Sequence, residues 1–169
     1  MALGVALVHR DSADRERGLK LLEQVRDMCL QERFFSSELP WVEVYIARAS
    51  VRDGDRDRAV ALMRKAVDEL FDRGQLAYGL PTTGVLVETL LGRGAPGEVA
   101  EAEGAMQRLA AAPADKGWVL RDIMLLRLRA LLAQAHGEEV AYRDLVDRYR
   151  AMAASLGFEG HMAWADAMR

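Results

Sequence analysis

Two glutamates, Glu43 and Glu88, stand inside segments that are otherwise apolar, and this placement makes them the first candidates for acid–base chemistry. A pair of carboxylates in different surroundings can donate and accept a proton in turn. In the alternative, each glutamate binds an arginine of a neighbouring helix and fixes the register of the two helices. The arginines available for such pairs include Arg48, Arg52, Arg121 and Arg127. We favour the ion pairs over catalysis.

Other catalytic and cofactor-binding patterns are weak in this sequence. The glycine-rich segment 92–97 lacks the lysine of a phosphate-binding loop, and Pro96 removes one amide donor. The three histidines are far apart, and none has a second ligand at metal-binding helical spacing. A single cysteine, Cys29, excludes an internal disulfide and a cysteine-cluster metal site. We therefore expect no metal, no cofactor and no enzymatic activity.

The segments that carry these residues are all predicted to be helical. The sequence is rich in Ala, Leu, Arg and Glu, and no segment alternates with a period of two for long enough to form a strand. The segment Leu80–Gly84 is expected to open a helix at Val85, with Pro81 and the threonines Thr82 and Thr83 in its cap or turn. The predicted helices cover residues 1–10, a helix capped by Asp11, Ser12 or Asp14 that runs to about residue 31, then 37–51, 55 to about 72, 85–91, 98–111, 118 to about 135 and 138–156, followed by a short capping helix within 160–169.

The helix that ends near Asp72 shows best how these helices are expected to pack. Its apolar side chains recur at steps of three and four, namely Ala59, Leu62, Met63, Ala66, Val67, Leu70 and Phe71. A small residue, a bulky pair and a second small residue suit two helices that cross closely. The crossing positions Gly18, Ala59, Ala102 and Tyr142 (or Ala141) lie 41, 43 and 40 residues apart. This period predicts stacked helical hairpins, each too small to bury its own apolar face.

The same helix resembles the second helix of a tetratricopeptide repeat. The resemblance rests on Gly54, Asp55, Ala59, Met63 and Ala66, with Ile46 and Ala47 at the packing positions of the first helix. Glu43 stands where that family favours an aromatic residue, and the period exceeds the usual thirty-four residues. The resemblance implies an all-α, tetratricopeptide-like solenoid of about seven to eight antiparallel helices with a short C-terminal capping helix, in one domain over residues 1–169.

A groove is the binding surface that this resemblance implies, because the first helices of tetratricopeptide arrays line a concave face. An aromatic ring beside two arginines there would suit an acidic or C-terminal peptide. Packing of Trp41 against the neighbouring hairpin explains that residue at least as well. The candidate partner-binding residues are Trp41, Val44, Arg48 and Arg52, with Arg127 added by the fourth unit.

Three further segments resemble the C-terminal region of large actinobacterial regulators. They are Leu21–Asp27, Ala111–Asp115 and Leu156–Trp164. Regulators of this type join a nucleotide-cyclase-like domain, a signalling ATPase module and a tetratricopeptide-like tail. The resemblance implies a fragment of a signalling or transcriptional regulator, and no cyclase or ATPase residue can be transferred to this chain.

The charge and hydropathy of the sequence indicate the expected cellular location and binding partners of the chain. The chain mixes 23 basic with 26 acidic residues along its length, which gives no basic patch for nucleic acid. The longest nearly uncharged run, 75–92, is too broken to span a bilayer, and the N-terminus lacks the pattern of a signal peptide, so a cytoplasmic location is expected. The apolar segment 1–10 suits a homodimer contact.

Taken together, these features predict a non-catalytic protein-interaction scaffold that binds its own upstream domains or a partner peptide. The alternative is a sensor that holds a small effector between helices, with Glu43, Arg48 or Glu88 as polar contacts. A free-standing enzyme is the least favoured class.

Overall fold

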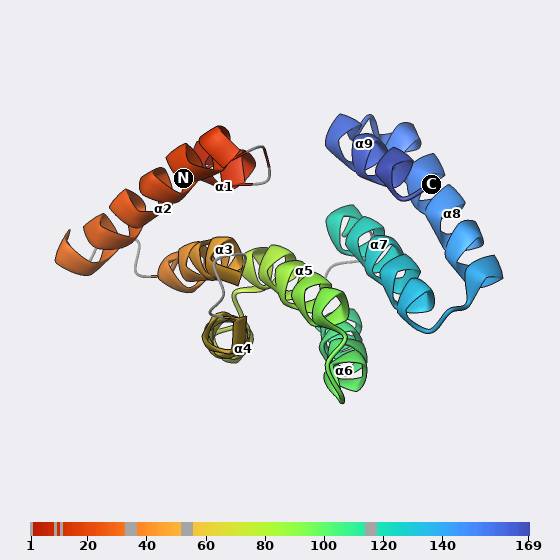
Figure 1. The fold of residues 1–169 in the computed structure, drawn as a ribbon, viewed down its shortest axis with the longest axis horizontal. Helices are drawn as coiled ribbons and strands as arrows, with labels where there is room; N and C mark the ends of the chain where they lie inside the picture. The colour runs from red at the N-terminus through yellow and green to blue at the C-terminus, as the bar shows by residue number, and fades with distance from the viewer. Residues whose placement is uncertain (1, 9, 11, 33–36, 52–55, 114–117) are drawn as a thin grey trace. The chain divides into compact units, whose positions relative to one another are not determined.

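The computed structural model describes residues 2–8, 10, 12–32, 37–51, 56–113 and 118–169, and within these ranges every regular element is an α-helix (Figure 1). The all-α prediction is confirmed for these residues, whereas a repeat solenoid stays a prediction. The helices are α1 Ala2–Val8, α2 Ser12–Glu32, α3 Leu39–Val51, α4 Arg56–Asp72, α5 Leu76–Arg93, α6 Glu98–Ala111, α7 Val119–Ala135, α8 Glu139–Leu156 and α9 Glu159–Ala167. None of the described helices is long and apolar enough to cross a membrane.

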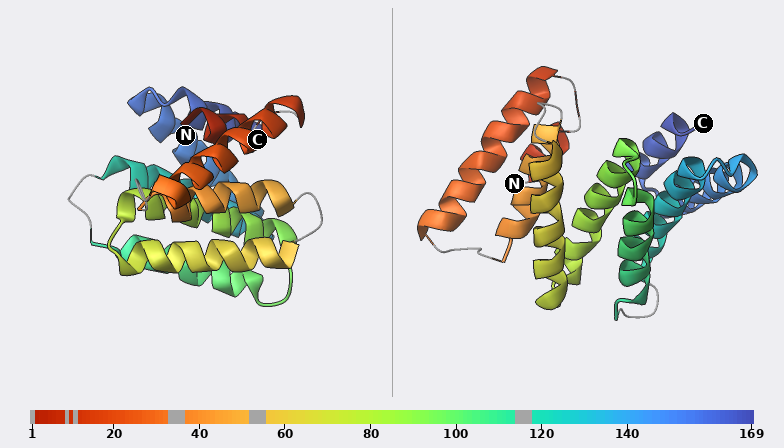
Figure 2. Two further views of the ribbon diagram at one scale, coloured as in Figure 1. Left: turned by 90° about the vertical axis from the view of Figure 1, so that its left-hand side faces the viewer. Right: turned by 60° about the horizontal axis from the view of Figure 1, so that its bottom comes forward.

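The chain divides into two compact units, Met1–Thr89 and Leu90–Arg169, and each is described by itself. The expectation of one domain over residues 1–169 stays a prediction. The first unit contains α1 to α4 and most of α5, and α3 and α4 lie side by side as an antiparallel hairpin (Figure 2). Its core includes the fully buried side chains Leu22, Val42, Val44, Val60, Met63 and Leu70. Burial of each stabilises the fold by about 1.5–3 kcal/mol.

Helix α4 largely follows the predicted apolar face. Ala59, Met63, Ala66, Val67 and Leu70 are buried as expected, and Val60 is buried as well. Leu62 differs, because 40% of its surface is exposed. In α2, Met28 is 58% exposed, whereas its neighbour Cys29 is buried. The core-facing stripe of α2 runs through Leu22 and Cys29, which leaves Met28 about 100° away from it.

Helices α1 and α2 approach each other closely at two glycines. A Cβ atom on Gly18 would lie 2.8 Å from the carbonyl oxygen of Gly4, the Cβ of Leu7 and the backbone nitrogen of Val8. Two of these three atoms belong to backbone, which cannot move away without separating the helices. Gly18 is therefore a close-crossing position, as its place in the predicted repeat required.

Helix α5 begins nine residues earlier than the sequence indicated. Gly74, with φ of +66°, ends α4, and its amide and that of Gln75 bond back to Phe71 and Leu70. The chain then enters α5 at Leu76, so Pro81 lies inside the helix rather than in a cap. Proline cannot donate to the carbonyl four residues before it, but that carbonyl belongs to Ala77, which is exposed.

The two threonines after Pro81 are fully buried within α5, so their assignment to a cap or turn is wrong. The hydroxyl of Thr82 donates to the carbonyls of Tyr78 and Gly79 at 2.8 and 3.0 Å. That of Thr83 donates to the Gly79 carbonyl at 2.7 Å. Each hydroxyl thus finds an acceptor in the preceding turn of its own helix, which is what allows a polar side chain to be buried there.

The second unit contains the end of α5 and helices α6 to α9, in which α7 packs against α6 and α8, and α8 against α9. Its core cluster joins Ile123, Tyr149, Ala153 and Ala165. The partly buried side chains around it include Leu126, Met152, Phe158 and Met162. The short α9 packs against α8, and its role as the cap of a helical stack stays a prediction.

Candidate functional site

Helix α3 presents two opposite faces, and one of them contacts α5. Because an α-helix turns about 100° per residue, Trp41 and Arg48 share one face, and Glu43 and Ala47 share the other. The Trp41 ring packs against the ring of Tyr78, with centroids 5.6 Å apart. The Tyr78 hydroxyl donates to Glu38 at 3.0 Å, and Arg48 Nη2 lies 3.1 Å from Glu88 Oε2. This face joins α3 to α5.

The two polar contacts of this face also give the register between the helices. Glu38 with Tyr78, and Arg48 with Glu88, are each 40 residues apart. Equal separations at two places show that α3 and this part of α5 run parallel. The separation of 40 residues is close to the predicted period, whereas a repeat architecture stays a prediction.

Most of the candidate partner-binding residues make internal contacts in this structure. Trp41 packs against the neighbouring hairpin, as the alternative interpretation expected, and Arg48 forms an ion pair. Val44 is fully buried, so it supports the core and has no surface to offer a partner. Arg52 lies outside the described residues. Arg127 belongs to the second unit, where its guanidinium lies 4.8 Å from the centroid of the Trp164 ring.

The two glutamates first considered for acid–base chemistry have different roles. Glu88 forms the ion pair that the structural alternative predicted, with Arg48. The matching expectation for Glu43 is wrong, since no described arginine lies within ion-pair distance of its carboxylate. Partial burial is the main cause of the raised pKa of Glu43, and the negative charge of Glu69 raises this pKa further. The positive charges of Lys65 and Arg26 lower it. Glu43 lies on the opposite face of α3 from Arg48.

That opposite face lines a half-open pocket of about 340 Å³ among α2, α3 and α4, which we name the α2–α4 pocket. Its apolar lining is Ile46, Ala47, Ala59 and Leu62, and its charged lining is Glu23, Arg26, Glu43 and Arg58. Of these eight residues, the sequence singled out only Glu43 as a candidate for chemistry. No sequence pattern indicated the other seven lining residues as parts of a pocket, because they lie on three separate helices and come together only when these helices pack.

The charges of the α2–α4 pocket are unequally satisfied. Arg26 donates through Nε and Nη2 to one carboxylate oxygen of Asp27, at 3.2 and 3.0 Å. Within the described ranges, the carboxylates of Glu23 and Glu43 form neither a hydrogen bond nor a salt bridge. The pocket therefore contains two carboxylates without a bound cation beside apolar surface.

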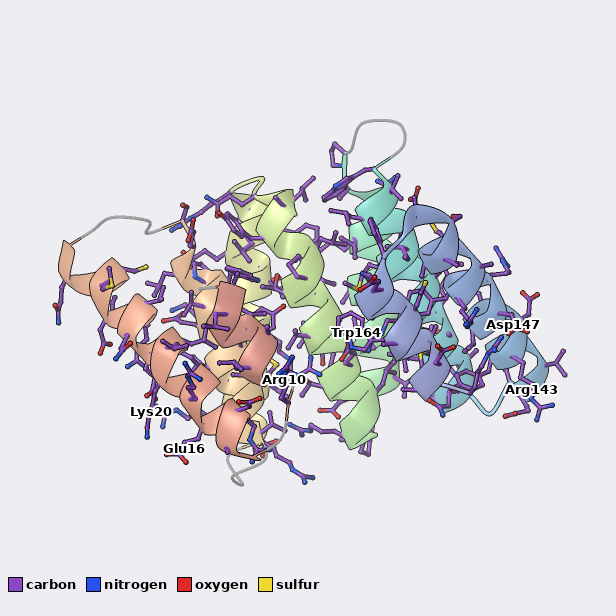
Figure 3. All side chains as sticks on the ribbon, turned by 90° about the horizontal axis from the view of Figure 1, so that it is seen from above. Arg10, Glu16, Lys20, Arg143, Asp147 and Trp164 are labelled. Atoms are coloured by element: carbon purple, nitrogen blue, oxygen red, sulfur yellow. The ribbon has the colours of Figure 1, made fainter. Side chains whose placement is uncertain are left out.

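A second pocket, also of about 340 Å³, lies in the second unit between α8 and the last residues of the chain. We name it the α8 pocket, and Arg143 and Asp147 mark it in Figure 3. Both of its acidic groups are paired. Glu139 lies 2.8 Å from Arg143, and Asp147 lies 2.6 Å from Arg169.

Aromatic and imidazole rings cluster around Tyr149 in the second unit. The Tyr149 hydroxyl and His161 Nδ1 are hydrogen-bonded at 2.7 Å, and the His161 ring packs edge-on against Trp164 of α9, labelled in Figure 3. Burial lowers the pKa of His161, and the positive charge of Arg127 lowers it further. The described residues contain no group of three or more side chains able to hold a metal ion.

Comparisons of the chain with protein-family models, curated proteins and solved structures give no match, so its resemblances to known families are neither supported nor refuted by them.

Proposed function

We propose that the chain is a non-catalytic helical scaffold that binds a segment of protein. The observation that supports this proposal is the α2–α4 pocket, a half-open hollow held by three helices. Its volume of about 340 Å³ is at the lower end of the range of ligand sites, which suits a few side chains of an inserted segment. Leu62 adds exposed apolar surface to the same pocket.

The segment would come from upstream domains of a larger regulator or from a separate partner protein. This part of the proposal draws on the resemblance to actinobacterial regulators of the cyclase and ATPase type. Self-association through α1 belongs to the same proposal, because Leu3 is 56% exposed while Leu7 and Val8 pack inward.

Selection of peptides from a random display library on the immobilised chain tests the scaffold function. We expect a shared motif to be enriched, and the resynthesised peptides to bind with measurable fluorescence anisotropy. Leu62→Asp should weaken binding by roughly tenfold or more, because it places a charge on apolar contact surface. Leu120→Asp in α7 is the matched control, since Leu120 is 48% exposed and lines neither described pocket.

Two results would overturn the proposal. One is a library that shows no enrichment beyond that on an unrelated helical protein. The other is equal loss of affinity in the Leu62 and Leu120 variants, which would indicate non-specific adhesion.

A small-molecule sensor is the second candidate, and the size of the α2–α4 pocket favours it as well. Of the three polar contacts expected for an effector, only Glu43 lines this pocket, since Arg48 and Glu88 bind each other. A metabolite that raises the Tm of the chain, with an effect abolished by Leu62→Asp, would support the sensor. Absence of peptide enrichment in the same preparation would then favour the sensor over the scaffold.

A further inference from the structure

Two pockets of equal volume in one chain differ in the state of their carboxylates. In the α8 pocket each acidic group has an arginine of this chain within 2.8 Å. In the α2–α4 pocket, Glu23 and Glu43 have no such partner among the described residues, while Arg26 is held by Asp27. Arg26 and Arg58 line the second pocket as well, so the two pockets differ in the pairing of their carboxylates and not in the number of their charges.

We infer that the α2–α4 pocket receives a lysine or arginine side chain of the bound segment, with Glu43 as its main contact. This inference rests on the proposed scaffold function and names the chemistry that the partner must bring. A guanidinium or ammonium group would supply the hydrogen bonds and the charge that the Glu43 carboxylate lacks.

The apolar lining of the pocket suits the rest of such a side chain. Ile46, Ala47 and Ala59 line the same hollow as Glu43. Lysine and arginine carry aliphatic stems that pack on apolar surface while the charged end reaches a polar partner. Partial burial, the main cause of the raised pKa of Glu43, removes water from this carboxylate, so an arriving cation recovers part of the lost solvation.

The positive charges already near Glu43 do not replace this guest. Lys65 and Arg26 act on Glu43 only from beyond salt-bridge distance, and Arg26 binds Asp27. Arg26 and Arg58, the two cations of the lining, both have interactions of their own, whereas among the described residues the carboxylates of Glu23 and Glu43 have no bound cation. An anionic guest would meet these two carboxylates, and like charges at close range repel, so the pairing favours a basic segment over an acidic one.

The test uses the whole chain, labelled with ¹⁵N, and four amino-acid derivatives as probes. N-acetyl-arginine amide and N-acetyl-lysine amide carry the positive group, N-acetyl-norleucine amide is the neutral control, and N-acetyl-glutamate amide is the anionic control. We expect the two cationic probes to shift amide signals of α2, α3 and α4, with a dissociation constant in the range of roughly 1–10 mM. The neutral probe should bind several times more weakly.

Two variants assign the effect to the pocket. Glu43→Gln should weaken binding of the arginine probe by roughly fivefold to tenfold, because it removes the charge and keeps the shape. Glu139→Gln in the α8 pocket is the matched control and should change nothing, since the glutamate it replaces is paired with Arg143. An unchanged amide spectrum away from the substitution shows that Glu43→Gln is folded.

Equal binding of the cationic and neutral probes, or equal affinity in wild type and Glu43→Gln, would overturn the inference. These results can be told apart from failure of the scaffold proposal. If the enriched peptides contain no basic residue and their binding depends on Leu62, the scaffold proposal stands and the inferred basic guest is wrong. Binding of the arginine probe that depends on Glu43, without any enriched peptide, would retain the cation site and reject the scaffold.

Discussion

The two units of this chain use opposite means to bring helices together. In the first unit, α1 and α2 meet where Gly18 and Gly4 leave no room for a Cβ atom. In the second unit, α8 and α9 meet across large rings, with Tyr149 fully buried against His161 and Phe158 nearby. Close backbone approach cannot accept added atoms, and a ring-filled core cannot lose them, so the two units should respond to opposite substitutions.

The two units also differ in how the carboxylates of their pockets are paired. Their pockets have equal volumes, but the carboxylates of the α8 pocket are paired and those of the α2–α4 pocket are not. The exposed pair Glu16–Lys20 on α2 shows that the first unit does form ion pairs elsewhere (Figure 3). Among the described residues, the α2–α4 pocket thus differs from the α8 pocket in having two carboxylates without a bound cation.

The largest effect is expected from Tyr149→Ala. The substitution removes a fully buried ring and its hydrogen bond to His161, and it should reduce the free energy of unfolding of the second unit by about 3–5 kcal/mol. Urea unfolding followed by far-UV circular dichroism measures this loss. Tyr149→Phe keeps the ring and should lose about 1 kcal/mol. Equal losses in both variants would show that the hydroxyl, rather than the ring, holds α8 to α9.

Gly18→Ala and Gly104→Ala should change stability in opposite directions, each by about 1 kcal/mol. Alanine favours a helix over glycine by about 1 kcal/mol, and a Cβ on Gly104 meets nothing within 4 Å, so this variant should gain. At Gly18 the added methyl overlaps backbone atoms of α1, and overpacking costs about 1–3 kcal/mol. Unfolding midpoints of the two variants settle the sign. A gain at both positions would mean that α1 moves aside freely.

The partly buried pair Arg48–Glu88 should contribute more than the exposed pair Arg143–Glu139. The first pair is 30% and 18% exposed, and the second is 74% and 63% exposed. A double-mutant cycle with Arg48→Met and Glu88→Gln should give a coupling energy of up to about 1 kcal/mol, because exposed charges are better screened. The same cycle on Arg143 and Glu139 should give almost none. Equal coupling in the two cycles would contradict the tie between α3 and α5.

The pH dependence of stability should be small and of opposite sign in the two units. The lowered pKa of His161 means that the unfolded chain takes up this proton first, so stability falls as the pH drops below the ordinary value of 6.5. The raised pKa of Glu43 means that the folded chain holds this proton more tightly, so stability falls as the pH rises from the ordinary value of 4.5 towards the raised one.

Urea midpoints measured between about pH 4 and pH 7 for wild type, His161→Gln and Glu43→Gln separate these two effects. Each variant should flatten the dependence of the urea midpoint on pH only in the pH range where the replaced side chain titrates. A variant that leaves the profile unchanged would show that its side chain is as well solvated in the folded chain as in the unfolded chain.

The helices themselves were readable from local patterns. Apolar residues at steps of three and four located α4. The helix ends predicted near residues 72, 91 and 156 lie within two residues of the observed ends, which are followed by Gly74, Gly94 and Gly157, all with positive φ. The start of α5 was not readable, because Pro81, Thr82 and Thr83 have the composition of a cap. In the structure Thr82 and Thr83 are buried, and their hydroxyls donate to the carbonyl of Gly79 in the preceding turn. These hydrogen bonds allow both threonines to lie inside a helix.

The sequence by itself determined the all-helical class of the described residues. This class depends on periodicity along one chain, which needs no knowledge of neighbours. The tertiary structure decided that Trp41 and Arg48 tie α3 to α5, that Val44 is core, and that Glu43 faces a pocket with Glu23. Those outcomes depend on which face of α3 meets which helix, and side chains from three helices converge only after the hairpins have packed.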